Sequence, residues 1–81
     1  MSLVLYTRPG CHLCDEARTA IEGMRPDLPP FELREVDIDS DENLLRAFLE
    51  RIPVVELDGE IVSELVLDES ALRVAFDRSA P

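Results

Sequence analysis

The sequence predicts an α/β fold with the order β-α-β-α-β-β-α, in which helices cover both faces of a four-stranded mixed sheet. The first apolar strand, the amphipathic helix after it and the second strand predict a parallel pair, because a helical crossover returns the chain in the same direction. An Asp-Gly pair between two later apolar runs predicts a β-hairpin, which adds antiparallel strands.

The first strand is predicted at residues 3–6, an uninterrupted apolar run typical of a strand that is buried on both faces and central in the sheet. Apolar residues then recur three and four positions apart, which predicts a helix over residues 11–24. The apolar stripe of this helix is formed by Leu13, Ala17, Ala20, Ile21 and Met24. Pro26 ends the helix.

The second strand is predicted at residues 31–39, where apolar and polar residues alternate with a change of phase after Glu35. Asp39 followed by Glu42 resembles a capping box and predicts the start of a second helix, which Pro53 closes. The apolar face of this helix is formed by Leu44, Leu45, Phe48, Leu49 and Ile52.

The hairpin consists of strands at residues 54–57 and 61–62, joined by the Asp-Gly pair. Asp68 and Glu69 place negative charge at the start of a last helix, and we expect residues 79–81 to fray. The apolar face of this last helix is formed by Ala71, Leu72, Ala75 and Phe76.

The composition allows one domain over residues 1–81 with a single core. Hydrophobic residues make up 46% of the chain, which is enough to fold without metal or several disulfides, so the two cysteines are available for chemistry. The formal net charge of -10 predicts a surface that repels nucleic-acid phosphates and anionic membranes. We therefore expect no nucleic-acid or membrane partner, and protein partners that are basic or neutral where they dock.

The N-terminal apolar stretch lacks the positively charged region of a signal peptide, and no run approaches the roughly 20 apolar residues of a membrane span. We therefore expect a cytoplasmic protein. In that reducing compartment a closely spaced cysteine pair is more often catalytic or metal-binding than a permanent structural disulfide.

Cys11 and Cys14 lie at the predicted start of the first helix, directly after the first strand. Residues three apart share a face of a helix, so the two side chains are within reach of a reducible disulfide. The unpaired N–H groups and the dipole at the helix start stabilise a thiolate. We expect Cys11 to be the attacking nucleophile and Cys14, one turn further in, to resolve the mixed disulfide.

Two neighbouring side chains each have two interpretations. Arg8 either adds positive potential near Cys11 or is a solvated surface residue. His12 either tunes the thiolate or simply tolerates exposure between the cysteines. Both are candidates for the substrate-binding surface.

A zinc site within one chain lacks ligands, because there is no further cysteine and His12 is the single histidine. Metal binding would need two chains or an added thiol ligand. A second hypothesis therefore stands beside catalysis, namely a non-enzymatic module that carries metal or an iron-sulfur cluster through Cys11 in a dimer, or that serves only for interaction. The catalytic hypothesis predicts a monomer that binds no metal and requires no cofactor.

The segments LYTRPGCHLCDEAR, IPVV and LDGE, in this order along nearly the whole chain, resemble the glutaredoxin family of the thioredoxin fold. The resemblance implies a thiol-disulfide oxidoreductase acting on a disulfide-containing protein or a small thiol, with electrons from glutathione or a reductase. It also implies a cis Pro53 across from the cysteines and an Ile52 main chain whose N–H and C=O pair with the bound substrate.

The sequence also departs from that family. Arg8 stands where glutaredoxins usually carry a lysine, and His12-Leu13 stands where they carry a Pro-Tyr or similar pair. Ser63-Glu64 stands roughly where a Gly-Gly precedes the aspartate that helps to bind the carboxylates of glutathione, and Asp68 and Glu69 lie ahead of the last helix. Acidic residues repel carboxylates, so we expect weak glutathione binding.

Overall fold

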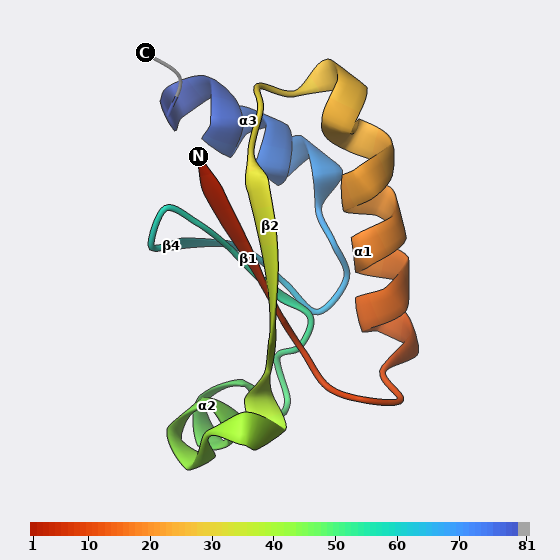
Figure 1. Cartoon of the computed structure of the whole chain (residues 1–81), viewed down its shortest axis with the longest axis vertical. Coiled ribbons are helices and arrows are strands. Elements are labelled where there is room, and N and C mark those ends of the chain that lie inside the picture. Colours follow the sequence, from red (N-terminus) through yellow and green to blue (C-terminus); the bar gives the residue numbers. More distant parts are fainter. Residues whose placement is uncertain (80–81) are drawn as a thin grey trace.

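The computed structural model describes residues 1–79 and contains the predicted succession of strands and helices (Figure 1). The strands are β1 (Ser2–Thr7), β2 (Glu32–Asp37), β3 (Val54–Leu57) and β4 (Glu60–Glu64). The α-helices are α1 (His12–Met24), α2 (Glu42–Phe48) and α3 (Glu69–Ser79), with short 3-10 helices η1 (Arg25–Asp27) and η2 (Ile38–Ser40). Within these residues, no helix combines the length and the apolar character that crossing a membrane requires.

The strands form one sheet in the order β2-β1-β3-β4. β1 is parallel to β2 and antiparallel to β3, and β3 is antiparallel to β4. The central place predicted for the first strand is confirmed, and its Leu3, Val4 and Leu5 are buried. A strand with neighbours on both sides and apolar cover on both faces reads as an uninterrupted apolar run.

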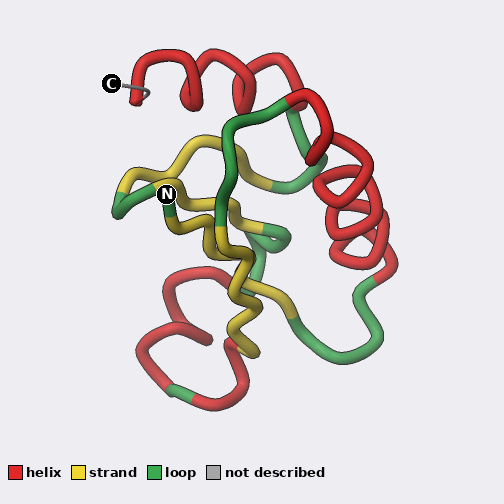
Figure 2. The backbone as a smooth tube through the Cα atoms, turned by 45° about the horizontal axis from the view of Figure 1, so that its top comes forward, coloured by secondary structure: helices red, strands yellow, loops and turns green. Residues whose placement is uncertain are grey.

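Helices pack against both faces of the sheet, as Figure 2 shows, with α1 and α3 on one side of the strands and α2 on the other. The larger core joins α1 and α3 to the strands and includes Leu5, Ile21, Val55, Leu72 and Phe76. The smaller core joins α2 and η2 to the strands and consists of Ile38, Phe48 and Val54, with Tyr6, Leu44, Leu45 and Ile52 around it.

The change of phase in β2 follows from this two-sided packing. Leu33 packs against the larger core, and Arg18 of α1 donates a hydrogen bond to Glu35 on the same face of β2. Val36 therefore points to the opposite face, since side chains alternate along a strand. Directly beyond the strand, Ile38 is buried in the smaller core. The apolar side chains therefore change from the face of the larger core to the face of the smaller core toward the end of β2.

The predicted capping box at the start of α2 is wrong. The N-cap is Asp41, whose carboxylate accepts hydrogen bonds from the N–H groups of Asn43 at 2.7 Å and Leu44 at 3.3 Å. Asp39 lies instead in η2, where its own N–H donates to the Asp37 carboxylate at 2.8 Å. Three aspartates lie within five residues of one another, and the intervening 3-10 turn shifts the helix start by two positions.

The predicted hairpin turn is confirmed. Asp58 and Gly59 both have positive φ, 47° and 92°, as a two-residue turn that follows the twist of the strands requires. Asp58 also pairs with the start of β1 through Ser2, whose N–H donates to the Asp58 carboxylate at 2.9 Å. At the other terminus α3 includes Ser79, which was expected to fray, and residues 80–81 lie outside the described part of the chain.

Candidate active site

Cys11 occupies the N-cap position of α1, in an extended conformation with φ −86° and ψ 106°. The chain reaches it through a tight turn in which Gly10 has φ 82° and the Cys11 N–H donates to the Arg8 carbonyl at 3.2 Å. The Sγ atom of Cys11 accepts a hydrogen bond from the Cys14 N–H at 3.1 Å. The sulfur therefore lies where a capping oxygen would, next to the N–H groups and positive dipole end of the helix.

Cys14 lies in the first turn of α1 and forms a disulfide with Cys11, their Cα atoms being 5.2 Å apart. Cys14 is completely buried, whereas Cys11 is partly exposed. Of the two cysteines, Cys11 is therefore the one in contact with solvent. The order of attack and resolution expected for the two cysteines stays a prediction, and this difference in exposure is the feature that bears on it.

Arg8 and His12 flank the reactive turn. The Arg8 guanidinium lies 3.1 Å from the Asp39 carboxylate, both side chains being close to 40% exposed, so this cation links the turn to η2. His12, at the start of α1, is exposed to solvent beside Cys11. Both residues thus lie close to Cys11 in the chain, Arg8 through the backbone hydrogen bond of the turn and His12 as the next residue.

The Ile52-Pro53 peptide bond is cis, as the resemblance implied, and Pro53 is fully buried. Tyr6 near the end of β1 pairs with Val54 at the start of β3, which brings this bond and the cysteine turn to the same end of the sheet. The Ile52 N–H donates to the Phe48 carbonyl at 3.0 Å. The expectation that both main-chain groups of Ile52 are free is therefore wrong for the N–H, because the chain leaving α2 folds back to cap that helix.

Arg51 lies directly before the cis bond, and sequence reasoning missed it. Its guanidinium pairs with Glu64 at the end of β4 and lies over the Phe48 ring, with the guanidinium carbon 5.1 Å from the ring centroid. The Arg51 carbonyl accepts a hydrogen bond from the Leu65 N–H at 2.9 Å. These contacts join the loop before β3 to the loop after β4, and the hydrogen bond from Arg51 lowers the pKa of the Glu64 carboxyl.

The residues between β4 and α3 fold into a compact loop. The Ser63 hydroxyl accepts a hydrogen bond from the Asp68 N–H at 3.0 Å, and the Asp68 carboxylate accepts one from the Ala71 N–H at 3.0 Å. The Asp68 side chain therefore caps α3 and places its own negative charge at that helix start. Across residues 1–79, no group of three or more His, Cys, Asp or Glu side chains is placed to hold a metal ion.

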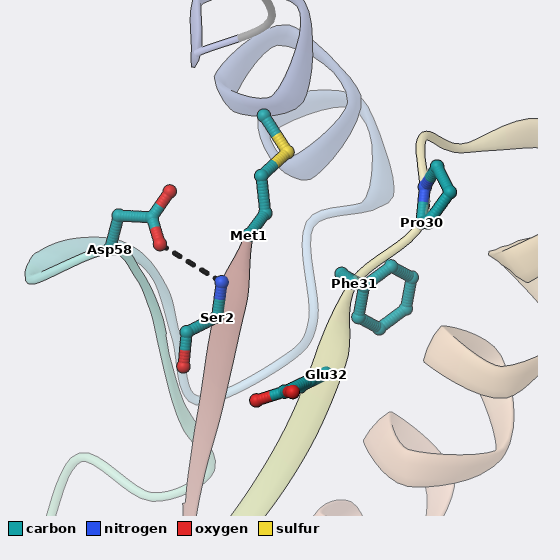
Figure 3. Close-up of a pocket in the computed structure, with 6 residues that line it drawn as sticks. All are labelled: Met1, Ser2, Pro30, Phe31, Glu32 and Asp58. Atoms are coloured by element: carbon teal, nitrogen blue, oxygen red, sulfur yellow. Dashed lines mark hydrogen bonds between the residues drawn. The ribbon is translucent and has the colours of Figure 1, made fainter.

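A pocket of about 480 Å³ lies at the end of the sheet opposite to the cysteine turn. Figure 3 shows the side chains that line it, with the hydrogen bond from the Ser2 N–H to the Asp58 carboxylate. Ser2 begins β1, whereas the cysteine turn follows the end of the same strand. This pocket is therefore separate from the cysteines.

A cysteine pair at the start of the first helix, after a central strand and at the same end of the sheet as a cis proline, defines a protein of the thioredoxin fold with a redox-type cysteine motif. The chain belongs to the family described as Glutaredoxin-like domain (DUF836), which matches residues 2–76. The resemblance inferred from the sequence is therefore confirmed.

Comparison with individual proteins agrees with this assignment. The glutaredoxin-like protein YDR286C homolog of Dictyostelium discoideum is 32% identical over 77 residues, covering 89% of this chain and 71% of that protein. The solution structure of protein Ne2328 from Nitrosomonas europaea is 30% identical with a TM-score of 0.83, covering 93% of this chain and 89% of that one. Thioredoxin from Fasciola hepatica is 23% identical with a TM-score of 0.64, covering 98% of this chain and 80% of that one, and shows the fold alone.

Proposed function

We propose that this protein is a thiol-disulfide oxidoreductase that reduces disulfides or mixed disulfides of a protein or small-thiol substrate, with Cys11 attacking and Cys14 resolving. The observation that carries the proposal is the position of the Cys11 sulfur. This sulfur caps α1 and accepts a hydrogen bond from the Cys14 N–H, and Cys11 is the more exposed residue of the disulfide pair. A helix start stabilises the thiolate, which is the nucleophilic form of cysteine.

In the first step the Cys11 thiolate attacks one sulfur of a substrate disulfide, forming a mixed disulfide and releasing the other substrate sulfur as a thiolate. In the second step Cys14, deprotonated, attacks the Cys11 sulfur and releases the remaining substrate thiolate. Two electrons have then passed to the substrate, whose two sulfurs take up two protons, and the protein holds the Cys11–Cys14 disulfide seen in the structure. A thiol reductant must return both cysteines to thiols before the next cycle.

We propose that the substrate docks on the surface around the partly exposed Cys11. The Ile52 carbonyl and Pro53 would align an extended substrate backbone, because the loop before β3 lies at the same end of the sheet as Cys11. Arg8 and His12 border the same turn and would contact the substrate from the other side. The Ile52 N–H takes no part, since it is bonded to Phe48.

Two kinds of reductant could return the Cys11–Cys14 disulfide to thiols. One is a reductase that carries its own dithiol, and the other is glutathione. We propose that glutathione serves poorly. The start of α3 is already capped by the Asp68 carboxylate, and the Arg51 guanidinium is paired with Glu64. Neither the helix start nor this guanidinium is therefore free to receive a carboxylate of glutathione. The cycle itself needs no bound cofactor, and we propose that it operates in a monomer in the reducing cytoplasm.

The test is to capture the mixed disulfide. Cys14→Ser removes the resolving thiol, so incubation of the reduced variant with a peptide disulfide should accumulate a covalent adduct on Cys11, detected by intact mass and released by dithiothreitol. The unmodified protein should reduce the peptide without accumulating the adduct, and Cys11→Ser should do neither. Absence of the adduct in Cys14→Ser, with reduction also absent in the unmodified protein, would refute the proposed function.

A further inference from the structure

An apolar groove of about 150 Å³ lies beside the cysteine turn, between α1 and the loop that precedes α3. Its apolar walls come from Leu13, Ala17 and Ala20 of α1 and from Val66 and Leu67 of the loop. Figure 1 shows this loop running alongside α1 before α3 begins. Leu13 lies between the two cysteines in the chain, so one end of the groove lies in the same turn of α1 as Cys14.

The groove mouth exposes large apolar side chains. Val66 is 69% exposed and Leu13 is 43% exposed, while the neighbouring Leu65 is 51% exposed. Leu13 and Val66 both line the groove, so its mouth is an exposed apolar surface, and such surfaces mark binding sites. They are thus candidates for contact with a partner.

The loop wall is held in one conformation. Leu65 has φ 63°, a left-handed backbone that is costly for a bulky residue, and its N–H is fixed on the Arg51 carbonyl. The Ser63 hydroxyl bridges the Val66 carbonyl at 3.5 Å and the Asp68 N–H at 3.0 Å, so hydrogen bonds span the loop. A preformed wall lowers the entropic cost of binding.

The charges at the groove are of one sign. Glu16 of α1 and Glu69 of α3 are the charged side chains among its lining residues, and no basic side chain of residues 1–79 lines it. The chain as a whole carries a net charge of -10. A bound segment with lysine or arginine beside an apolar residue would match the groove in both respects, whereas an acidic segment would be repelled.

We propose that this groove docks a protein segment in which a leucine-sized apolar side chain lies beside lysine or arginine, and that such basic segments mark the disulfide-bearing partners of this protein. The partner's apolar side chain fills the space between Leu13 and Val66, and its cations face Glu16 and Glu69. The choice of partner rests on the proposed function, whereas the docking itself needs no thiol chemistry.

Binding is therefore measured on the oxidised protein, using labelled peptides with serine in place of cysteine and fluorescence anisotropy at low salt. One peptide carries leucine between arginines, a second carries leucine between glutamates, and a third carries alanine between arginines. The first should bind about tenfold more tightly than either of the others, and its advantage over the acidic peptide should shrink at high salt.

Two variants locate the binding. Val66→Ser should weaken the leucine–arginine peptide about fivefold, and Val74→Ser, which alters a 55%-exposed valine on α3 outside this groove, should leave it unchanged. The double substitution Glu16→Gln and Glu69→Gln should make the affinities for the basic and the acidic leucine peptides nearly equal. Equal binding of all three peptides, or equal effects of the two valine substitutions, would overturn the proposal. If the unmodified protein shows this peptide selectivity but does not reduce disulfides, the proposed function is refuted and the docking proposal stands.

Discussion

Arg51 pairs with Glu64, so the guanidinium directly before the Ile52-Pro53 bond is held by a carboxylate at the end of β4. The same residue offers its carbonyl to the Leu65 N–H. Two loops at the end of the sheet that carries the cysteines are thus fastened by one arginine, through both its side chain and its backbone. The arrangement also leaves this cation neutralised, which bears on the choice of electron donor.

Glu64→Gln should improve the use of glutathione as electron donor, because it removes a negative charge and releases the Arg51 guanidinium to receive a carboxylate. We expect a gain of about two- to fivefold in glutathione-dependent reduction at low salt, as for an exposed ion pair. A coupled assay that follows the oxidation of NADPH by glutathione reductase measures it.

Glu60→Gln is the matched control. Like Glu64, Glu60 lies on β4 and forms an ion pair with an arginine, Arg78 at 3.4 Å, but it lies at the opposite end of the strand. It should leave the glutathione rate unchanged. Rapid turnover of the unmodified protein at physiological glutathione concentration would contradict the prediction, because it would show that the protein binds the carboxylates of glutathione despite Asp68 and Glu64.

The single tyrosine provides a titration probe, because the chain has no tryptophan. Tyr6 lies against the Phe48 ring, and its hydroxyl donates to the Glu56 carboxylate at 3.4 Å. Burial raises the pKa of Tyr6 above its ordinary value of 10.0, and the charge and hydrogen bond of Glu56 raise it further. Absorbance near 295 nm should therefore show a midpoint above 10.0 that Glu56→Gln lowers and Glu60→Gln does not.

The same shift gives stability a pH dependence with a fixed sign. The unfolded chain loses the phenol proton near pH 10.0, whereas the folded chain keeps it to higher pH. The contribution of Tyr6 to stability is thus fully present below pH 10.0 and is lost as the pH rises through the folded pKa. Urea unfolding should show this alkaline loss in the unmodified protein and a smaller loss in Tyr6→Phe, and equal losses would contradict the assignment.

Asp41→Ala should lower the free energy of unfolding by about 1 kcal/mol, because it leaves the N–H groups of Asn43 and Leu44 without their capping carboxylate. Asp39→Ala is the control from the position that the sequence favoured. It removes only the exposed contact with Arg8 and should cost less than about 0.5 kcal/mol. Urea unfolding measures both, and a larger loss for Asp39→Ala would restore the capping box predicted from the sequence.

The fold could be predicted because local signals agreed with one another along the chain. The buried run of β1, the Asp58-Gly59 turn and the cysteines at the start of α1 each specify their structure within a few residues. The start of α2 could not be located in the same way. Asp37, Asp39 and Asp41 are all suitable caps, and the choice depends on Ile38 reaching the smaller core.

The candidate site divides in the same manner. Cys11 and Cys14 were found from their spacing and their position after β1, and Pro53 from the resemblance. Arg51 was missed because its ion pair with Glu64 joins residues that only the sheet brings together. The Ile52 N–H was assigned to the substrate because the sequence does not show that the chain after α2 turns back onto Phe48.

The alkylation rate of Cys11 in the Cys14→Ser variant tests the central claim most directly. At neutral pH, iodoacetamide should modify this thiol at least about tenfold faster than a cysteine in an unstructured peptide, because the start of α1 stabilises the thiolate. Cys11→Ser leaves only the buried Cys14 and should react more slowly than the same peptide, and urea should bring both variants to the peptide rate. If folded Cys14→Ser reacts no faster than the peptide, Cys11 is not an activated nucleophile.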